Sequence, residues 1–288
     1  MRKTLGVAVV MLAVALASSA CTNPPSPPPA PPHTSAPTVK PPLTVGVAND
    51  LPGLGFLDPG NNVRSGFDVE LARWLGQNTT PGFRPVFAGV NIEDREPWIA
   101  DGRLSLVIDV FSITDKRRER IGMAGPYALT RQGVLTRSGD DRVKNVNDLI
   151  GKNICTIEGS TSLNEIGLRE GIFVTTEKGN SGCVQRLLNG QVDAFSTDQL
   201  ILHGFAQANS GKLSVKDISF GRAEEYGVGF FKGDLRTCEV IREGIRNFII
   251  GGAWDQFFRT NFPTLDPSSY RPDPETLDSC TQPGEGQN

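Results

Sequence analysis

Arg117 stands where an apolar run meets a charged one. The run Leu104 to Val110 predicts a buried strand, and the helical pattern that follows begins at Thr114. Residues just outside the strand ends of an open α/β sheet line its ligand crevice, and a guanidinium matches a carboxylate with two hydrogen bonds. This placement predicts an Arg presented to a small carboxylate. Because Arg118 and Arg120 follow, a helix that simply begins with basic residues stays an alternative.

Four further groups of polar residues lie at predicted strand ends. Asp50 and Asp198 each follow a strand, Ser112 and Thr114 precede Arg117, and Gly159 to Ser162 forms a turn of small residues at a helix start. An α-amino acid carries a carboxylate and an ammonium on one carbon, so its receptor needs an Arg and helix N-terminal amides for the first and a carboxylate for the second. Arg117, Thr161 and Asp198 supply that set. For Asp198 a helix cap, and for the turn an ordinary cap, remain open.

The elements around these residues alternate between short apolar runs and amphipathic stretches from Leu43 to Cys280. Phe67 to Leu75 predicts a helix with Asp68 placed to cap it, and Glu239 to Phe258 predicts a long helix. Such alternation predicts βα units and mainly parallel sheets. The pattern restarts after Tyr127, and a strand over 225–230 returns toward the first series. The sequence therefore predicts an α/β fold of two lobes with a ligand cleft and two hinge crossings.

The N-terminal region has the composition of an export signal followed by a spacer. A charged start, an apolar run over 5–17 and small residues precede Cys21, and the run is too short to span about 30 Å of hydrocarbon. Cys21 after small residues predicts lipidation, although Ser18 replaces the usual Leu of a lipobox. Ten of the 21 prolines lie between Pro24 and Pro42, which predicts an extended tether. The sequence therefore predicts a folded protein that is lipid-anchored to the outer face of the cytoplasmic membrane.

The predicted boundaries divide the chain into six parts. These are a lipoprotein signal peptide (1–20), the lipidated Cys with a Pro-rich tether (21–42), the first part of lobe 1 (43–130), lobe 2 (131–224), the return to lobe 1 with a C-terminal segment (225–280) and a tail (281–288). The net charge of −3 becomes more negative when Arg2 and Lys3 leave with the signal. This charge argues against nucleic acid as a partner, and we expect a monomer.

Five cysteines constrain the folded body. If Cys21 is lipidated, Cys155, Cys183, Cys238 and Cys280 remain, and an even remainder in an exported protein points to disulfides. Three pairings are possible. We favour Cys155 with Cys183 and Cys238 with Cys280, because each pair then joins segments of one predicted lobe. No two cysteines have metal-ligand spacing and neither His lies near one, so we expect no metal and no cofactor.

Several motifs, in this order, resemble the signatures of family 3 solute-binding proteins, the polar amino acid receptors of ABC importers. They are Gly66 to Ala72, Ser112-Ile113-Thr114 with Arg117, Gly125-Pro126-Tyr127, Glu158 to Ser162, Val192-Asp193-Ala194 with Asp198, and Tyr226 to Gly229. The resemblance runs from about Thr44 to Phe258. Asn49 to Gly55, Cys155 to Thr161, and Cys183 ahead of Asp193 to Asp198 resemble most closely the lipid-anchored glutamate-binding proteins of high-GC Gram-positive bacteria.

The resemblance implies roles for individual residues. Arg117 would clamp the ligand α-carboxylate with Ser112 and Thr161, Asp198 would take the α-ammonium, and Cys155 would bridge to Cys183. Many relatives carry an aromatic lid where this chain has Gly53, so stacking there is doubtful. The candidate ligand-binding residues are Asp50, Arg95, Val110, Phe111, Ser112, Thr114, Arg117, Ser160, Thr161, Thr197 and Asp198, with Phe56, Phe87 and Phe111 closing the apolar side.

Arg95 is the candidate for a second carboxylate on the ligand. It resembles the Arg that relatives binding acidic amino acids carry in the helix before the buried strand. A solvated helix Arg that pairs with Glu93 or Glu96 is the alternative, and Arg64 and Arg131 are weaker candidates for the same role.

The resulting functional prediction is a receptor that closes on glutamate, aspartate, glutamine or asparagine and delivers it to an ABC permease. A sensor module for a membrane signalling protein would use the same residues and stays open. A small-acid dehydratase on the same fold is a further alternative. Hydrolytic chemistry is disfavoured because His33 lies in the spacer, His203 has no evident nucleophile beside it, and the chain has no G-x-S-x-G or H-E-x-x-H motif.

Overall fold

The computed structural model of the protein describes residues 40–280. The predicted signal peptide, Cys21, most of the predicted tether and the tail 281–288 lie outside the described residues. The main sheet contains β1 (Pro42–Val47), β4 (Arg84–Gly89), β5 (Leu106–Ser112), β6 (Gly122–Arg137), β7 (Asn153–Ile157), β8 (Phe173–Glu177), β9 (Ala194–Asp198), β10 (Leu213–Val215) and β11 (Phe220–Phe230); β2 (Phe56–Leu57) and β3 (Arg64–Ser65) form a separate hairpin.

The helices fill the connections between these strands. They are α1 (Phe67–Asn78), α2 (Arg95–Ala100), α3 (Asp115–Arg118), α4 (Thr161–Gly167), α5 (Asn180–Leu188), α6 (Gln199–Ala208), α7 (Leu235–Ile250) and α8 (Ala253–Asn261), with 3₁₀ turns η1 (Ile92–Asp94), η2 (Val146–Leu149) and η3 (Pro267–Ser269). None of the helices within residues 40–280 is long and apolar enough to cross a membrane.

The sheet joins two parallel groups of strands through an antiparallel centre. Its order is β4-β1-β5-β11-β6-β9-β7-β8, with β10 paired to β6. β1 is parallel to β4 and β5, and β7 is parallel to β8 and β9. The long strands β6 and β11 are antiparallel to each other, β11 pairs with β5, and β6 pairs with β9. The strands β6 and β11 therefore connect the two parallel groups. The chain passes from the first group to the second through β6 and returns through β11.

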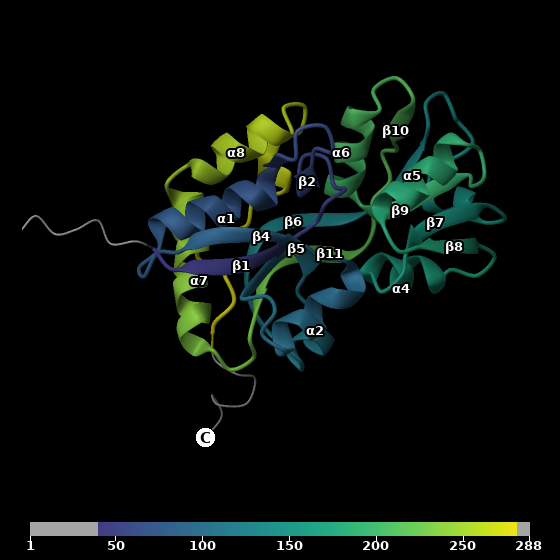
Figure 1. Ribbon diagram of the computed structural model, residues 1–288. Coiled ribbons are helices and arrows are strands. Elements are labelled where there is room, and N and C mark those ends of the chain that lie inside the picture. The colour runs from purple at the N-terminus through teal and green to yellow at the C-terminus, as the bar shows by residue number, and fades with distance from the viewer. Residues whose placement is uncertain (1–39, 281–288) are drawn as a thin grey trace, which may run out of the picture. The chain divides into compact units, whose positions relative to one another are not determined.

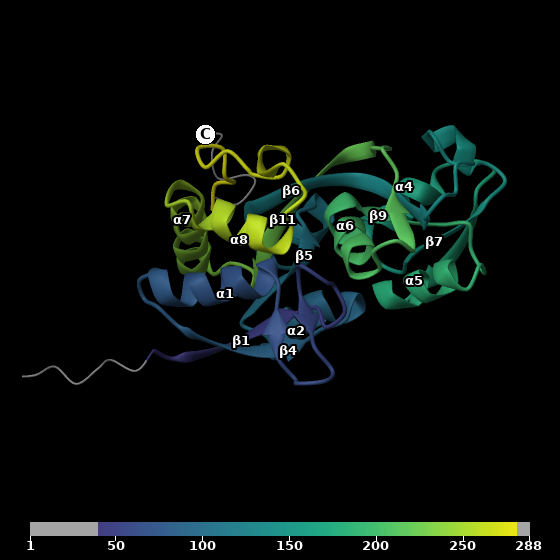
Figure 2. The ribbon, with the colours of Figure 1, turned by 90° about the horizontal axis from the view of Figure 1, so that it is seen from above.

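We call the first group, with α1, α2, α7 and α8, lobe 1, and the second group, with α4, α5 and α6, lobe 2. Figures 1 and 2 both show α1 beside β1 and β4, with α7 and α8 packed against α1, and α4 and α5 beside β7 at the other end of the sheet. The predicted α/β fold with two lobes and two crossings is confirmed. The predicted boundaries after residues 130 and 224 fall inside β6 and β11, and their exact placement stays a prediction.

The core of lobe 1 is aromatic where α1 meets the C-terminal helices. Phe67 packs edge-on against Trp254 at 5.4 Å between ring centroids and against Phe258 at 5.9 Å. The prediction of a single helix from Glu239 to Phe258 is wrong, because Gly252 adopts a φ of 78° and separates α7 from α8. A residue with a Cβ rarely adopts that conformation, whereas glycine adopts it readily. A left-handed residue cannot continue a right-handed helix, so the helical run is interrupted at this glycine.

Asp68 does not cap α1, contrary to the prediction. The N-cap position is Gly66, which has no side-chain cap, and Asp68 lies inside the first turn with a fully buried side chain. Gly66 has a φ of 114°, and a Cβ there would lie 2.0 Å from the Leu54 carbonyl oxygen. Asp68 lies past the N-cap position, and its carboxylate accepts from Val110 of β5 and Tyr127 of β6 instead of from the first N–H groups of the helix.

Both predicted disulfides are confirmed. Cys155 in β7 is bonded to Cys183 in α5, and Cys238 in α7 is bonded to Cys280. The first bridge fixes a helix of lobe 2 on its sheet, and the second fixes the end of the described chain on lobe 1.

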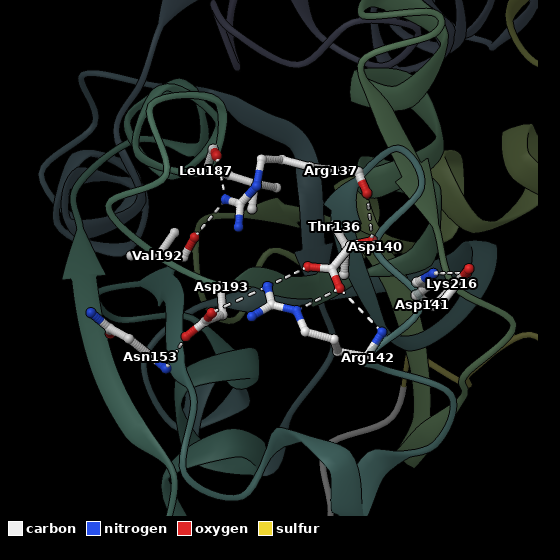
Figure 3. A network of polar contacts seen from close by, with 10 residues as sticks. All are labelled: Thr136, Arg137, Asp140, Asp141, Arg142, Asn153, Leu187, Val192, Asp193 and Lys216. Atoms are coloured by element: carbon white, nitrogen blue, oxygen red, sulfur yellow. Dashed lines mark hydrogen bonds and ion pairs between the residues drawn. The ribbon is translucent and has the colours of Figure 1, made fainter.

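A polar network fixes the amino ends of the lobe 2 strands (Figure 3). Arg137 donates to the carbonyl oxygens of Leu187 and Val192 at 2.7 and 2.9 Å. Arg142 pairs with Asp140 at 2.6 Å, and Asp193 accepts the Asn153 N–H at 3.0 Å. These contacts leave the carboxyl ends of β7 and β9, at the other end of the same strands, free to line a cavity.

Candidate functional site

A cavity of about 240 Å³ lies between the two lobes, at the carboxyl ends of their parallel strands. Lobe 1 contributes residues that follow β1 and residues at the end of β5, and lobe 2 contributes the ends of β7 and β9. The predicted residues that line it are Asp50, Arg95, Val110, Ser112, Arg117, Ser160, Thr161, Thr197 and Asp198. Segments up to 148 residues apart in sequence thus meet at one place, as expected for the crevice of an α/β sheet.

Arg117 is presented from the short helix α3, directly after β5. The residue is 7% exposed, and Nη1 donates to the Ser112 carbonyl oxygen at 2.6 Å. Thr114 does not line the cavity; it is the N-cap of α3, and its hydroxyl accepts the Arg117 N–H at 3.2 Å. Burial and the neighbouring charge of Arg95 lower the pKa of Arg117 to about 10, so it remains cationic at neutral pH.

Arg95 begins α2 and is 3% exposed, so the alternative of a solvated helix Arg does not apply. Its Nη1 donates to the Asp109 carbonyl oxygen at 2.9 Å and lies 3.6 Å from the Asp109 carboxylate. Its Nε is buried and has no hydrogen-bond partner among residues 40–280. A buried guanidinium with an unused donor beside a cavity is suited to an anionic ligand group.

Phe111 lies beneath this site and does not line it. The ring is fully buried, and the guanidinium carbons of Arg95 and Arg117 lie 4.3 and 4.7 Å from its centroid. The same ring therefore supports both cations. Phe56 and Phe87 do not line the cavity either, and its apolar wall is formed by Leu51, Val90, Ile92, Ile157 and Ile201.

Asp198 ends β9 and faces the same cavity from lobe 2. Its two carboxylate oxygens accept from the Gln132 amide and the Tyr226 hydroxyl, both at 2.6 Å. It occupies the N-cap position of α6 but makes no capping hydrogen bond, so the alternative role of a helix cap does not apply. Burial, followed by the charge of Glu224, raises the pKa of Asp198 to about 7.

The turn that opens α4 brings hydroxyl groups to the lobe 2 wall. Ser160 is the N-cap of this helix, because its hydroxyl accepts the Leu163 N–H at 3.1 Å. The hydroxyls of Ser162 and Thr197 lie 3.2 Å apart. Ser160 thus has a structural task in addition to lining the cavity, and Thr161 is its neighbour on the cavity wall.

Two contacts join the lobes beside the cavity. The Asp50 carboxylate accepts the Ser181 N–H of α5 at 3.0 Å, and Lys178 pairs with Glu93 at 3.0 Å. Asp50 and Glu93 belong to lobe 1, whereas Lys178 and Ser181 belong to lobe 2. The structure therefore has the lobes in contact on one side of the cavity.

The sequence analysis missed Asp109, which lines the cavity next to Arg95. Burial raises the pKa of Asp109 to about 7, although the charge of Arg95 opposes that shift. A carboxylate inside the apolar run Leu104 to Val110 was the available signal, since charged residues are rarely buried unless paired. Asn49, Asn91, Lys178 and Asn180 also line the cavity and were not predicted. Within residues 40–280, no group of three His, Cys, Asp or Glu side chains is arranged to hold a metal ion.

Comparisons with known proteins agree with this geometry. A family model described as bacterial extracellular solute-binding proteins, family 3, matches residues 43–264. The glutamate-binding protein GluB of Corynebacterium efficiens is 30% identical over 230 residues, covering 76% of this chain and 78% of that protein. The ABC transporter glutamine-binding protein GlnH of Bacillus subtilis is 24% identical over 268 residues, covering 90% and 97%. A solved structure of an ancestral arginine-binding protein bound to glutamine has a TM-score of 0.70 at 26% identity, covering 77% of this chain and 97% of that one.

Proposed function

Because this chain belongs to the bacterial extracellular solute-binding proteins, family 3, we propose that its cavity closes on glutamate, with aspartate, glutamine and asparagine as the competing ligands. The family comprises extracytoplasmic amino acid-binding proteins of ABC importers, and the fold is the two-lobe type II fold of periplasmic binding proteins. Its relatives and structural neighbours are substrate-binding proteins and not enzymes.

One observation carries the choice of ligand: two buried guanidinium groups, Arg95 and Arg117, and the buried carboxylate of Asp198 line one cavity. In the proposed complex Arg117 binds the α-carboxylate, with Ser112 and the Thr161 hydroxyl beside it, and Asp198 binds the α-ammonium. Arg95 then remains for a carboxylate at the far end of the ligand. The charge of Arg95 already has Asp109 at 3.6 Å, but its Nε donor has no partner within residues 40–280, and a ligand carboxylate accepts from a guanidinium more strongly than an amide does, which favours glutamate.

The proposal is tested by calorimetry with the four amino acids on the wild-type protein and on Arg117→Ala. Removing one partner of a buried charge pair costs about 3–5 kcal/mol, so we expect the variant to lose more than about 100-fold in affinity. Arg131→Ala is the control, because Arg131 is exposed and lies outside the cavity lining. A wild-type protein that binds none of the four ligands, or full affinity in Arg117→Ala, would contradict the proposal.

The location that we propose is the outer face of the cytoplasmic membrane, with a lipid on Cys21 and delivery of the ligand to an ABC permease. The export signal, the Cys after small residues and the Pro-rich segment support it. Labelling with a palmitate analogue in the native host should be lost in Cys21→Ser. Undiminished labelling in that variant would exclude Cys21 as the lipidated residue.

A further inference from the structure

Val110 has a backbone conformation that its side chain disfavours. Its φ is 41°, in the left-handed region that β-branched residues rarely enter. It lies in β5, where the pairing with β11 shifts register between Gly227 and Gly229, so that β5 carries extra residues between Val107 and Phe111. An interaction outside the β5–β11 ladder must therefore hold this conformation in place.

This distortion changes which side chains reach the cavity. In a regular strand, neighbouring side chains point to opposite faces. Here the consecutive residues Asp109 and Val110 both line the cavity, together with Ser112, while Phe111 is buried beneath Arg95 and Arg117. Around the left-handed residue, the side chains of β5 thus do not alternate between the two faces of the sheet, and three residues of this strand line the cavity.

Asp68 is the group that contacts the Val110 backbone. Its Oδ2 accepts the Val110 N–H at 3.0 Å, and its Oδ1 accepts the Tyr127 hydroxyl at 2.9 Å. The Asp68 side chain is 0% exposed, and its own N–H donates to the Leu54 carbonyl oxygen at 3.2 Å. A fully buried carboxylate is costly, so its two hydrogen bonds and its position in the first turn of α1 are the features that compensate it.

We propose that Asp68 is a positioning residue: its carboxylate holds Val110 in the left-handed conformation and thereby places the β5 wall of the ligand cavity. The identity of the ligand rests on the proposed function, whereas the contact itself does not. Asp68 does not line the cavity itself, and its contact with the cavity wall is the hydrogen bond to Val110.

A second buried tyrosine, on the other strand that crosses between the lobes, makes a similar contact with a carboxylate. The Tyr127 ring, in β6, lies 6.0 Å from the ring of Tyr226 in β11. Tyr226 donates to Asp198, just as Tyr127 donates to Asp68. Each lobe therefore has one buried carboxylate held by a tyrosine of a crossing strand, with Asp68 behind the lobe 1 wall and Asp198 in the lobe 2 wall.

The test compares Asp68→Ala and Asp68→Asn by two measurements. Hydrogen exchange of the Val110 amide in the ligand-free protein reports the contact directly, and calorimetry with glutamate reports its effect on binding. In Asp68→Ala we expect the Val110 amide to lose most of its protection and the glutamate Kd to rise about tenfold or more. Asparagine keeps one acceptor for the Val110 N–H, so the Val110 protection and the glutamate Kd of Asp68→Asn should lie between those of Asp68→Ala and the wild type. If Asp68→Ala does not fold, Asp68→Asn provides the test.

Val110→Gly separates positioning from general destabilisation. Glycine adopts positive φ without a steric penalty, so the strand no longer needs Asp68 to hold it. The loss of affinity caused by Asp68→Ala should therefore be smaller in the Val110→Gly background than in the wild type. A purely structural role of Asp68 would give equal losses in both backgrounds.

Asp234→Ala is the matched control. Asp234 also accepts a backbone N–H in the first turn of a helix, from Thr237 at 2.9 Å, but lies away from the cavity. It should lower thermal stability and leave both Val110 exchange and the glutamate Kd unchanged. Unchanged Val110 protection in Asp68→Ala would overturn the proposal. If the wild type binds none of the four amino acids, the proposed function fails, while the exchange measurement still decides the role of Asp68.

Discussion

Arg95 and Arg117 share one aromatic ring, and each also has a carboxylate nearby, Asp109 at 3.6 Å from Arg95 and Glu96 at 3.7 Å from Arg117, so two like charges can line one cavity. The Phe111 ring attracts both cations and offers neither of them a hydrogen-bond acceptor. Burial and, after it, the charge of Arg95 lower the pKa of Arg117, because two cations close together disfavour one another. An anion that contacts both would relieve that repulsion, and a ligand with two carboxylates is suited to do so.

Arg95→Gln should change which ligand is preferred. Hydrogen bonds to charged groups contribute about 1.5–3 kcal/mol, so we expect glutamate affinity to fall about 10- to 150-fold while glutamine affinity changes much less. Calorimetry with both ligands measures the change. Arg103→Gln is the control, because Arg103 is exposed and pairs with Asp101 at 2.6 Å away from the cavity. A wild-type preference for glutamine would remove the role proposed for Arg95.

The sequence predicts which residues line the cavity where the residue type and its place at a strand end are enough to identify them. Arg117 and Asp198 are charged groups at strand ends, and both line the cavity as expected. Asp68 was misread because its partner Val110 is 42 residues away, and only the packing of α1 on β5 brings them together. Phe111 was placed on the wrong side of the strand, because its position beneath the two Arg residues follows from the distortion at Val110.

At the scale of elements, α5 lacks a cap of its own. Its N-cap position is Gly179, which has no side chain to accept the first N–H groups. The acceptor comes from lobe 1 instead, because the Asp50 carboxylate accepts the Ser181 N–H. This cap exists only while the lobes are in contact, so the helix terminus and the closure of the lobes stabilise each other.

Asp50→Ala should weaken ligand binding through this contact. An N-cap contributes about 0.5–2 kcal/mol, so we expect the glutamate Kd to rise about 2- to 30-fold. X-ray scattering at a fixed subsaturating glutamate concentration should show a larger mean radius of gyration than in the wild type. Asp58→Ala is the control, since Asp58 accepts the Gly60 N–H at 2.8 Å within its own exposed turn. Equal affinities of the two variants would show that the α5 cap does not contribute to closure.

Most helices and strands could be predicted from the periodicity of apolar residues. The errors lie at positions where contacts with neighbouring elements decide where a helix or a lobe ends. The apolar pattern through residues 239–258 is continuous, and only the left-handed Gly252 divides it into two helices. The crossing strands β6 and β11 gave no compositional boundary, because they pair with each other between β5 of lobe 1 and β9 of lobe 2, and each is largely buried along its length. The strands themselves were recognisable, whereas the order in which they join the lobes follows from pairing across long sequence separations.

At the scale of the whole molecule, the contact region between the lobes concentrates buried acid groups. Burial raises the pKa of Asp68 to about 6 and the pKa values of Asp109 and Asp198 to about 7. The ordinary pKa of Asp is about 3.9, so the folded state binds these protons more tightly than the unfolded state does. A site built to hold a zwitterion therefore makes the stability of the ligand-free protein depend on pH.

The sign of that dependence follows from linkage. Below the unfolded pKa of about 4, the three carboxyl groups are protonated in both states and their contribution to stability is fully present. As the pH rises, the unfolded state loses these protons first, and the contribution is lost until the pH passes the folded pKa values of about 6 to 7. His203 acts in the opposite direction, because burial lowers its pKa and adds stability above about pH 6.5.

We therefore expect urea denaturation of ligand-free protein, in a His203→Gln background, to give a lower free energy of unfolding at pH 8 than at pH 5. Asp198→Asn should shrink this difference by about 1 kcal/mol or more, since a shift of one pKa unit corresponds to a free energy of that order. Asp140→Asn is the control, because Arg142 holds the pKa of Asp140 well below its usual range and Asp140 does not titrate between pH 5 and 8. If the two Asn variants show the same difference between pH 5 and pH 8, Asp198 is ionised throughout this range, and the ligand ammonium meets a preformed carboxylate.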